Sequence, residues 1–120
     1  MVPSSDSAVV LQVLPSLITG GVERGTVEIA QAIAGTGGTA LVASEGGPMV
    51  RQIERAGGTH IALPLAAKSP FGIWRNAAAL ERLIRYRNVS LVHARSRAPA
   101  WSAWLACQRT GVPSRRYSNV

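Results

Sequence analysis

The stretch that most constrains this chain is a run of apolar residues that leads into a pair of glycines. Residues 8–14 are apolar apart from Gln12, which predicts a strand buried on both faces, as in a parallel sheet. Gly20 and Gly21 follow after a short loop, and the next residues have the spacing of an amphipathic helix. Backbone N–H groups at such a helix start lack partners, and the helix dipole favours negative charge there. We therefore expect a phosphate or a sugar hydroxyl to bind at these glycines.

The rest of the chain repeats this pattern of a strand followed by a helix. Apolar runs predict further strands at residues 39–43, 59–63 and 89–94, and helical spacing predicts helices over about 21–35, 49–56, 71–87 and 100–110. The order is β-α-β-α-β-α-β-α, and every connection is long enough for a right-handed crossover. This order predicts an α/β, Rossmann-like fold with a doubly wound parallel sheet. In the last helix we expect Trp101, Trp104 and Leu105 to be buried, and Cys107 to be a small buried apolar residue.

The two ends of the chain do not fit this pattern. Residues 1–7 predict a short disordered lead-in. Gly111, Val112 and Pro113 are typical of the entry to another strand, but residues 114–120 have neither the hydrophobicity nor the length of a buried strand. We therefore predict one domain over residues 8–113 that lacks its fifth strand, followed by a tail at 114–120.

Candidate site residues gather at the ends of the predicted strands, because such sheets bind ligands beyond the C-terminal ends of their strands. Each candidate also has a structural explanation: a turn for a glycine, a helix start for an acidic residue, a hydrogen bond for a histidine and solvent for an arginine. The main candidates are Gly20, Gly21, Glu23, His93, Arg95 and Arg97, and the further rim candidates are Ser44, Glu45 and Gly46.

The composition narrows the class of protein. Thirteen lysines and arginines against six acidic residues give a net charge of +7, which attracts polyanions. A single cysteine excludes an internal disulfide and fits a reducing compartment, and no apolar run is long enough to span a membrane. These features favour a cytoplasmic protein. His60 and His93 have no acidic or cysteine neighbours at metal-binding spacing, so we predict neither a metal nor a cofactor.

Two stretches are similar to a known family. Val10-Leu11-Gln12-Val13-Leu14-Pro15, followed by Gly20-Gly21-Val22-Glu23-Arg24, resembles the opening of family 4-like glycosyltransferases of the GT-B fold, and so does the stretch from Val89 to Ser96. The resemblance covers about residues 8–113 and indicates the N-terminal domain of such an enzyme. A dinucleotide-binding or P-loop function is not supported, because the chain has neither Gly-x-Gly-x-x-Gly nor Gly-Lys-Ser/Thr.

The resemblance implies a function. The intact enzymes of this family move a sugar from a nucleotide-sugar donor to an acceptor hydroxyl, in the synthesis of cell-surface polysaccharide, lipopolysaccharide or glycolipid. Their N-terminal domain mainly holds the acceptor, which is a sugar or a lipid-linked sugar, and its glycine loop approaches the donor. Their second domain grips the nucleotide and carries a Glu-x7-Glu motif. Contact with the inner face of an anionic membrane would suit a lipid-linked acceptor.

The chain also departs from the family. Relatives continue from Gly-Val-Pro into an apolar strand that ends in a Thr-x-His-Gly-like element, whereas this sequence turns to Ser114-Arg115-Arg116. We interpret the chain as truncated or frameshifted after about residue 113, and as inactive alone because the donor-binding domain is missing. The alternative is a non-catalytic α/β module that binds a phosphorylated ligand or an anionic membrane surface. A nucleic-acid binder is disfavoured because no recognised motif supports it.

Overall fold

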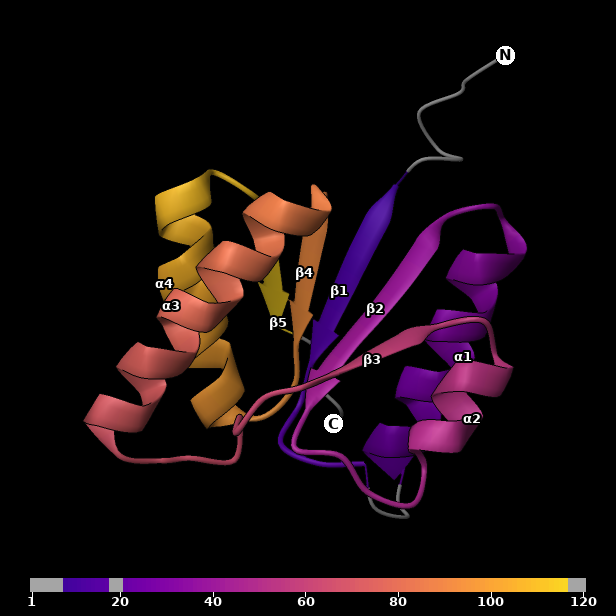
Figure 1. Cartoon of the computed structure of the whole chain (residues 1–120), viewed down its shortest axis with the longest axis horizontal. Coiled ribbons are helices and arrows are strands. Elements are labelled where there is room, and N and C mark those ends of the chain that lie inside the picture. Colours follow the sequence, from indigo (N-terminus) through magenta and orange to yellow (C-terminus); the bar gives the residue numbers. More distant parts are fainter. Residues whose placement is uncertain (1–7, 18–20, 117–120) are drawn as a thin grey trace.

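The computed structural model describes residues 8–17 and 21–116. Within them, five parallel strands form one sheet in the order β3-β2-β1-β4-β5. Helices α1 and α2 cover one face of the sheet, and α3 and α4 cover the other (Figure 1). The predicted α/β, Rossmann-like architecture is therefore confirmed. The strands are β1 (Val9–Val13), β2 (Thr39–Ser44), β3 (Thr59–Ala62), β4 (Leu91–Ala94) and β5 (Ser114–Arg116), and the helices are α1 (Gly21–Gly35), α2 (Val50–Arg55), α3 (Pro70–Arg87) and α4 (Arg97–Thr110).

Strand β1 lies at the centre of the sheet, which explains its apolar sequence. It pairs with β2 along one edge and with β4 along the other, and helices lie over both faces. Leu11 and Val13 are fully buried as a result. The chain leaves β1 toward α1 on one face and leaves β4 toward α4 on the opposite face (Figure 1). The sheet therefore has its topological switch point between β1 and β4, where folds of this kind bind ligands.

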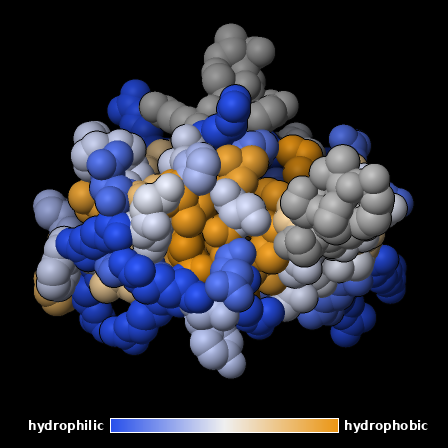
Figure 2. Space-filling view, turned by 90° about the horizontal axis from the view of Figure 1, so that it is seen from above, coloured by the Kyte–Doolittle hydropathy of each residue, from blue (hydrophilic) through white to orange (hydrophobic). Residues whose placement is uncertain are grey.

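Alternate side chains of the strands form two apolar layers. Leu11, Leu41 and Val92 pack toward α3 and α4, where Leu80 and Ala103 meet them. The layer on the other face contains Leu14, Ala30, Val42 and Ile53. Seen from above, apolar side chains gather at the centre of the molecule, and hydrophilic side chains surround them (Figure 2).

The prediction that a fifth strand is absent is wrong. Ser114–Arg116 forms β5, which pairs in parallel with β4, with Val92 opposite Ser114. The N–H of Val92 also donates to the carbonyl of Pro113, at 3.0 Å. Ser114 and Arg115 are exposed, so backbone hydrogen bonds hold this edge strand without burying an apolar side chain. A polar three-residue strand of this kind carries no hydrophobic signal in the sequence. The predicted lead-in at 1–7 and the last four residues of the predicted tail lie outside the described residues.

The predicted burial of the α4 tryptophans is also wrong. Trp101 is 59% exposed and Trp104 is 48% exposed, and their rings meet edge to face with centroids 6.2 Å apart. Leu105 is half-buried. Small residues make up the buried face of α4 because the helix packs closely on α3: the hydroxyl of Ser102 donates to the carbonyl of Ile73 at 2.9 Å. That buried face consists of Pro99, Ser102, Ala103, Ala106 and Cys107, so the prediction for the cysteine is confirmed.

Candidate functional site

The loops that follow β1 and β2 are joined by backbone hydrogen bonds at the C-terminal edge of the sheet. The N–H of Glu45 donates to the carbonyl of Pro15, and the N–H of Leu17 donates to the carbonyl of Gly46, both at 2.9 Å. The N–H of Met49 then donates to the carbonyl of Leu17, at 3.0 Å. The two loops therefore form one hydrogen-bonded unit.

The glycine turn lies only partly within the described residues. Gly20 lies outside them. Gly21 is the first residue of α1 and is exposed, with open space where a Cβ would lie. Glu23 is half-buried in the first turn, where a negative charge is favourable to the helix dipole.

Arg95 is buried beside the first turns of α1. The residue is 3% exposed, and its backbone N–H extends the sheet by donating to the carbonyl of Val13 at 2.9 Å. Its Nη2 donates to Oε1 of Gln12 at 3.4 Å, and Nε2 of Gln12 donates to the carbonyl of Thr26 in α1 at 3.1 Å. A Cβ on Gly25 would lie 3.8 Å from Nη1 of the guanidinium. The single polar side chain of the β1 run thus connects a buried cation to α1.

His93 lies on the same side of the sheet, next to this cation. The strand register sets it between Gln12 of β1 and Arg115 of β5. Burial lowers the pKa of His93, and the positive charges of Arg95 and Arg115 lower that pKa further, so the ring is neutral at pH 7. Its Nδ1 is buried and makes no hydrogen bond within the described part of the chain.

Ser44 and His60 form a second polar pair at the same edge. Oγ of Ser44 lies 2.7 Å from Nε2 of His60 and also accepts the backbone N–H of Gly46, at 2.9 Å. Ser44 is fully buried, and Gly46 has a φ of 103°, a conformation that favours glycine. Burial lowers the pKa of His60, and the carboxylate of Glu54 opposes this shift more weakly. Ser44 is therefore hydrogen-bonded both to the His60 ring and to the backbone of Gly46, and the pair holds the loop at Gly46.

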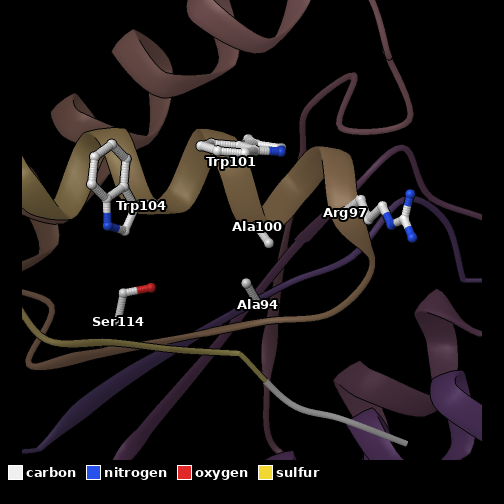
Figure 3. Close-up of a pocket in the computed structure, with 6 residues that line it drawn as sticks. All are labelled: Ala94, Arg97, Ala100, Trp101, Trp104 and Ser114. Atoms are coloured by element: carbon white, nitrogen blue, oxygen red, sulfur yellow. The ribbon is translucent and has the colours of Figure 1, made fainter.

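Arg97 lies on the other face of the sheet from Arg95. The intervening Ser96 has a φ of 75° and a ψ of 164°, a backbone region that is otherwise almost exclusive to glycine and costs about 1–3 kcal/mol. The strained turn at Ser96 lets two arginines only two residues apart reach opposite faces. In Figure 3 the Arg97 side chain extends from the start of α4. It lines a cavity of about 780 Å³ between α4 and strands β4 and β5.

The structure therefore brings some of the predicted residues together and separates others. Gly21, Glu23 and Arg95 lie at or beside the first turns of α1, and His93 is on the same face. The rim residues Ser44, Glu45 and Gly46 form the adjoining loop. Glu45 is exposed, and Arg97 lies on the α4 side of the sheet.

Sequence reasoning missed three participants. Gln12 stood out in the sequence as the polar residue of an apolar strand, and that interruption was the available signal. His60 contacts Ser44 only because β2 and β3 pair in a particular register, with Val42 opposite His60. Lys68 lines a cavity with Arg97, and its place just after the third predicted strand was the available signal.

Two classes of feature are absent from the described residues. No cluster of three or more His, Cys, Asp or Glu side chains is arranged to hold a metal ion. Among the helices at 21–116, none is both long enough and apolar enough to cross a membrane.

Comparison with known proteins supports the fold and the family. Residues 19–114 match the model of Glycosyltransferase Family 4. A glycosyltransferase from Rickettsia africae ESF-5 is 38% identical, with a TM-score of 0.82. The match covers 95% of this chain but only 31% of that enzyme, so the chain spans about a third of its length. No match was found among the curated proteins.

More distant structures share the fold alone. MurG from Acinetobacter baumannii is 16% identical with a TM-score of 0.70, over 91% of this chain and 34% of that one. The C-terminal domain of the PF1911 hydrogenase from Pyrococcus furiosus is 17% identical with a TM-score of 0.66, over 92% of this chain and 91% of that one. The family model covers most of this chain, from just before α1 to the start of β5. The chain therefore belongs to glycosyltransferase family 4.

Proposed function

We propose that this chain is the N-terminal, acceptor-side domain of an enzyme that transfers a sugar from a nucleotide-sugar donor to an acceptor hydroxyl. The observation that carries this proposal is the buried guanidinium of Arg95 beside the first turns of α1. The departing nucleoside diphosphate gains negative charge during transfer, and preorganised positive charge stabilises it. The start of α1 and Arg95 supply such charge in a partly dry environment.

Each residue at this edge has a distinct proposed role. The donor phosphate or its sugar is assigned to the backbone N–H groups at the start of α1, where Gly21 lies. Arg95 is too buried to lie on the surface, so it acts through its charge and through the Gln12 amide that ties it to α1. Glu23 and His93 complete the rim of the donor side. Ser44, Glu45 and Gly46 hold the neighbouring loop in place.

Transfer needs a second half that grips the nucleotide, so we propose that this chain alone is inactive. The test is a chimera in which residues 8–113 replace the matching segment of the Rickettsia africae glycosyltransferase. We expect release of nucleoside diphosphate from at least one common nucleotide-sugar by the chimera, and none by the chain alone. A folded chimera that is inactive on every donor that the parent enzyme uses would contradict the proposal.

A second candidate role is contact with an anionic membrane, which the start of α3 favours. Phe71 is 67% exposed and Trp74 is 54% exposed, and the guanidinium of Arg75 lies 5.7 Å from the Phe71 ring centroid. Exposed aromatic rings beside cations are typical of surfaces that bind the membrane interface. This contact would place the domain at the inner face of the membrane.

Vesicle sedimentation tests the membrane contact. The chain should sediment with vesicles of phosphatidylcholine and phosphatidylserine and stay in solution with phosphatidylcholine alone. The double variant F71A/W74A should lose most of this binding, whereas R82A, at an exposed arginine of the same helix, should keep it. Equal binding to neutral vesicles would count against an electrostatic contact.

A further inference from the structure

A second cavity lies at the switch point, on the α3 and α4 side of the sheet. It measures about 750 Å³ and is bounded by the loops that follow β1, β3 and β4 and by both helices. Its lining includes Pro15, which follows β1, and Pro99, which follows β4, so the cavity lies across the switch point between these two strands. Cavities of this size at this position are where α/β sheets commonly bind small ligands.

The lining of this cavity has a definite chemistry. Both charged residues among the described lining are cations, Lys68 and Arg97. Trp101 contributes a broad ring that remains largely exposed, and the half-buried Ile73 provides apolar surface. Contact of the apolar Trp101 ring with water is unfavourable in free energy. A ligand that covers the ring would remove this contact and gain that free energy on binding. Two cations beside a flat ring suit an anionic group attached to a compact, partly apolar body.

The cationic residues lie on well-defined segments of the chain. The loop before Lys68 is tied to α3, because Nδ2 of Asn76 donates to the carbonyl of Pro64 at 2.8 Å. The loop ends at Ser69, whose Oγ accepts the N–H of Gly72 at 3.0 Å. Arg97 is the first residue of α4. Both cations therefore extend from fixed backbone.

The cavity continues along α4. Arg97 and Trp101 also line the cavity of about 780 Å³ that runs past Trp104 toward Ser114 (Figure 3). A ligand longer than one sugar ring therefore has room to extend from the cationic end along the helix.

We propose that this cavity is the acceptor site and that its acceptor is a sugar bearing a phosphate or a carboxylate. The anionic group pairs with Lys68 and Arg97, and the C–H face of the sugar ring packs on Trp101. This inference rests on the proposed transfer function and adds to it the class of acceptor. It also separates the two substrates, with the donor phosphates on the α1 side and the acceptor on the α4 side.

The test is an NMR titration of the isotopically labelled full chain with glucose 1-phosphate. We expect shifts in the amide signals of Lys68, Ser96 and Arg97, and weaker or no shifts with uncharged glucose. K68A and R97A should each weaken binding about tenfold, as expected for the loss of one charged contact. W101A should weaken it by a similar factor. The matched control R82A changes an arginine outside the lining of this cavity and should change the affinity little.

Three results would overturn the proposal. Inorganic phosphate could bind as tightly as glucose 1-phosphate, which would show that the sugar contributes nothing. W101A could leave the affinity unchanged, which would show that the ring does not contact the sugar. UDP could bind more tightly than glucose 1-phosphate and shift the same amide signals, which would make this a nucleotide site. The titration needs neither donor nor transfer, so it can fail while the chimera releases nucleotide. The chimera can also fail while the titration succeeds, so the two proposals are tested separately.

Discussion

Nη2 of Arg95 donates to Oε1 of Gln12, and Nε2 of the same amide donates to the carbonyl of Thr26, so one side chain of β1 connects the residue after β4 to α1. All three residues are buried. The amide is the one polar interruption in an otherwise apolar strand, and its two hydrogen bonds satisfy its buried oxygen and nitrogen. Substitution of Gln12 should therefore lower the stability of the fold by more than the size of its side chain alone suggests.

The first prediction concerns Gln12. Q12L should lower the free energy of unfolding by about 1–3 kcal/mol, because it removes a hydrogen-bond acceptor from a buried charge. The double variant Q12L/R95M should be less destabilised than the sum of the two single variants, because it leaves no such charge behind. Urea unfolding of all four proteins measures this coupling. If the two single effects simply add in the double variant, the contact between Gln12 and Arg95 does not contribute to stability.

The second prediction concerns Gly25, where the helix passes the guanidinium. A Cβ there would lie 3.8 Å from Nη1 and 4.0 Å from Nη2 of Arg95, which is ordinary contact. G25A should therefore raise the free energy of unfolding by up to about 1 kcal/mol, because alanine favours the helix. G25L should destabilise the fold by displacing the guanidinium. Thermal melts of both variants provide the measurement, and a stabilising leucine would contradict the placement of Arg95.

The third prediction concerns pH. The pKa values of His60 and His93 are lowered below 6.5 in the folded chain, so the unfolded chain binds more protons. The histidine contribution to stability should be complete above pH 6.5 and should be lost as the pH falls from there through the folded pKa values. Denaturant unfolding across this range measures it. H60Q and H93Q should each flatten the pH dependence, and an unchanged slope in both would refute the shifts.

The fourth prediction separates the exposed aromatic residues from the core. W104A should cost less than about 1 kcal/mol, because the ring is 48% exposed and fills no enclosed space. L80A should cost about 2–5 kcal/mol, because Leu80 is fully buried between α3 and the sheet. Unfolding free energies of the two variants should therefore differ clearly. Equal costs would mean that Trp104 belongs to the core.

The strands with strongly apolar sequences were predictable, and so was the parallel direction in which they pair. The glycine turn after β1 and the alternation of strands and helices led directly to the Rossmann-like sheet. β5 was not predictable, because its three residues are held by the backbone of β4 and bury no apolar side chain. The burial of the α4 tryptophans is predicted wrongly from the sequence, because close packing on α3 places small residues on the buried face of α4.

The placement of the candidate residues at one edge of the sheet was predictable, but the contacts that they make were not. Parallel strands bring their C-terminal ends to one edge, so Ser44, His93 and Arg95 could be placed there from sequence. Contacts such as that between Ser44 and His60 depend on strand register, which hydrophobic patterns do not specify for an exposed edge. The division of Arg95 and Arg97 between two faces depends on the unusual backbone of Ser96, for which serine gives no signal.

We propose that the buried charge of Arg95 stabilises the departing diphosphate during transfer. The most direct measurement is the rate of nucleoside diphosphate release by the chimera that carries this domain, compared with the same chimera bearing Q12L/R95M. Circular dichroism should show that both are folded. We predict a loss of about 100-fold in kcat, the lower end of the range for removing one preorganised electrostatic interaction. A folded double variant that keeps the full rate would show that the charge of Arg95 does not assist transfer.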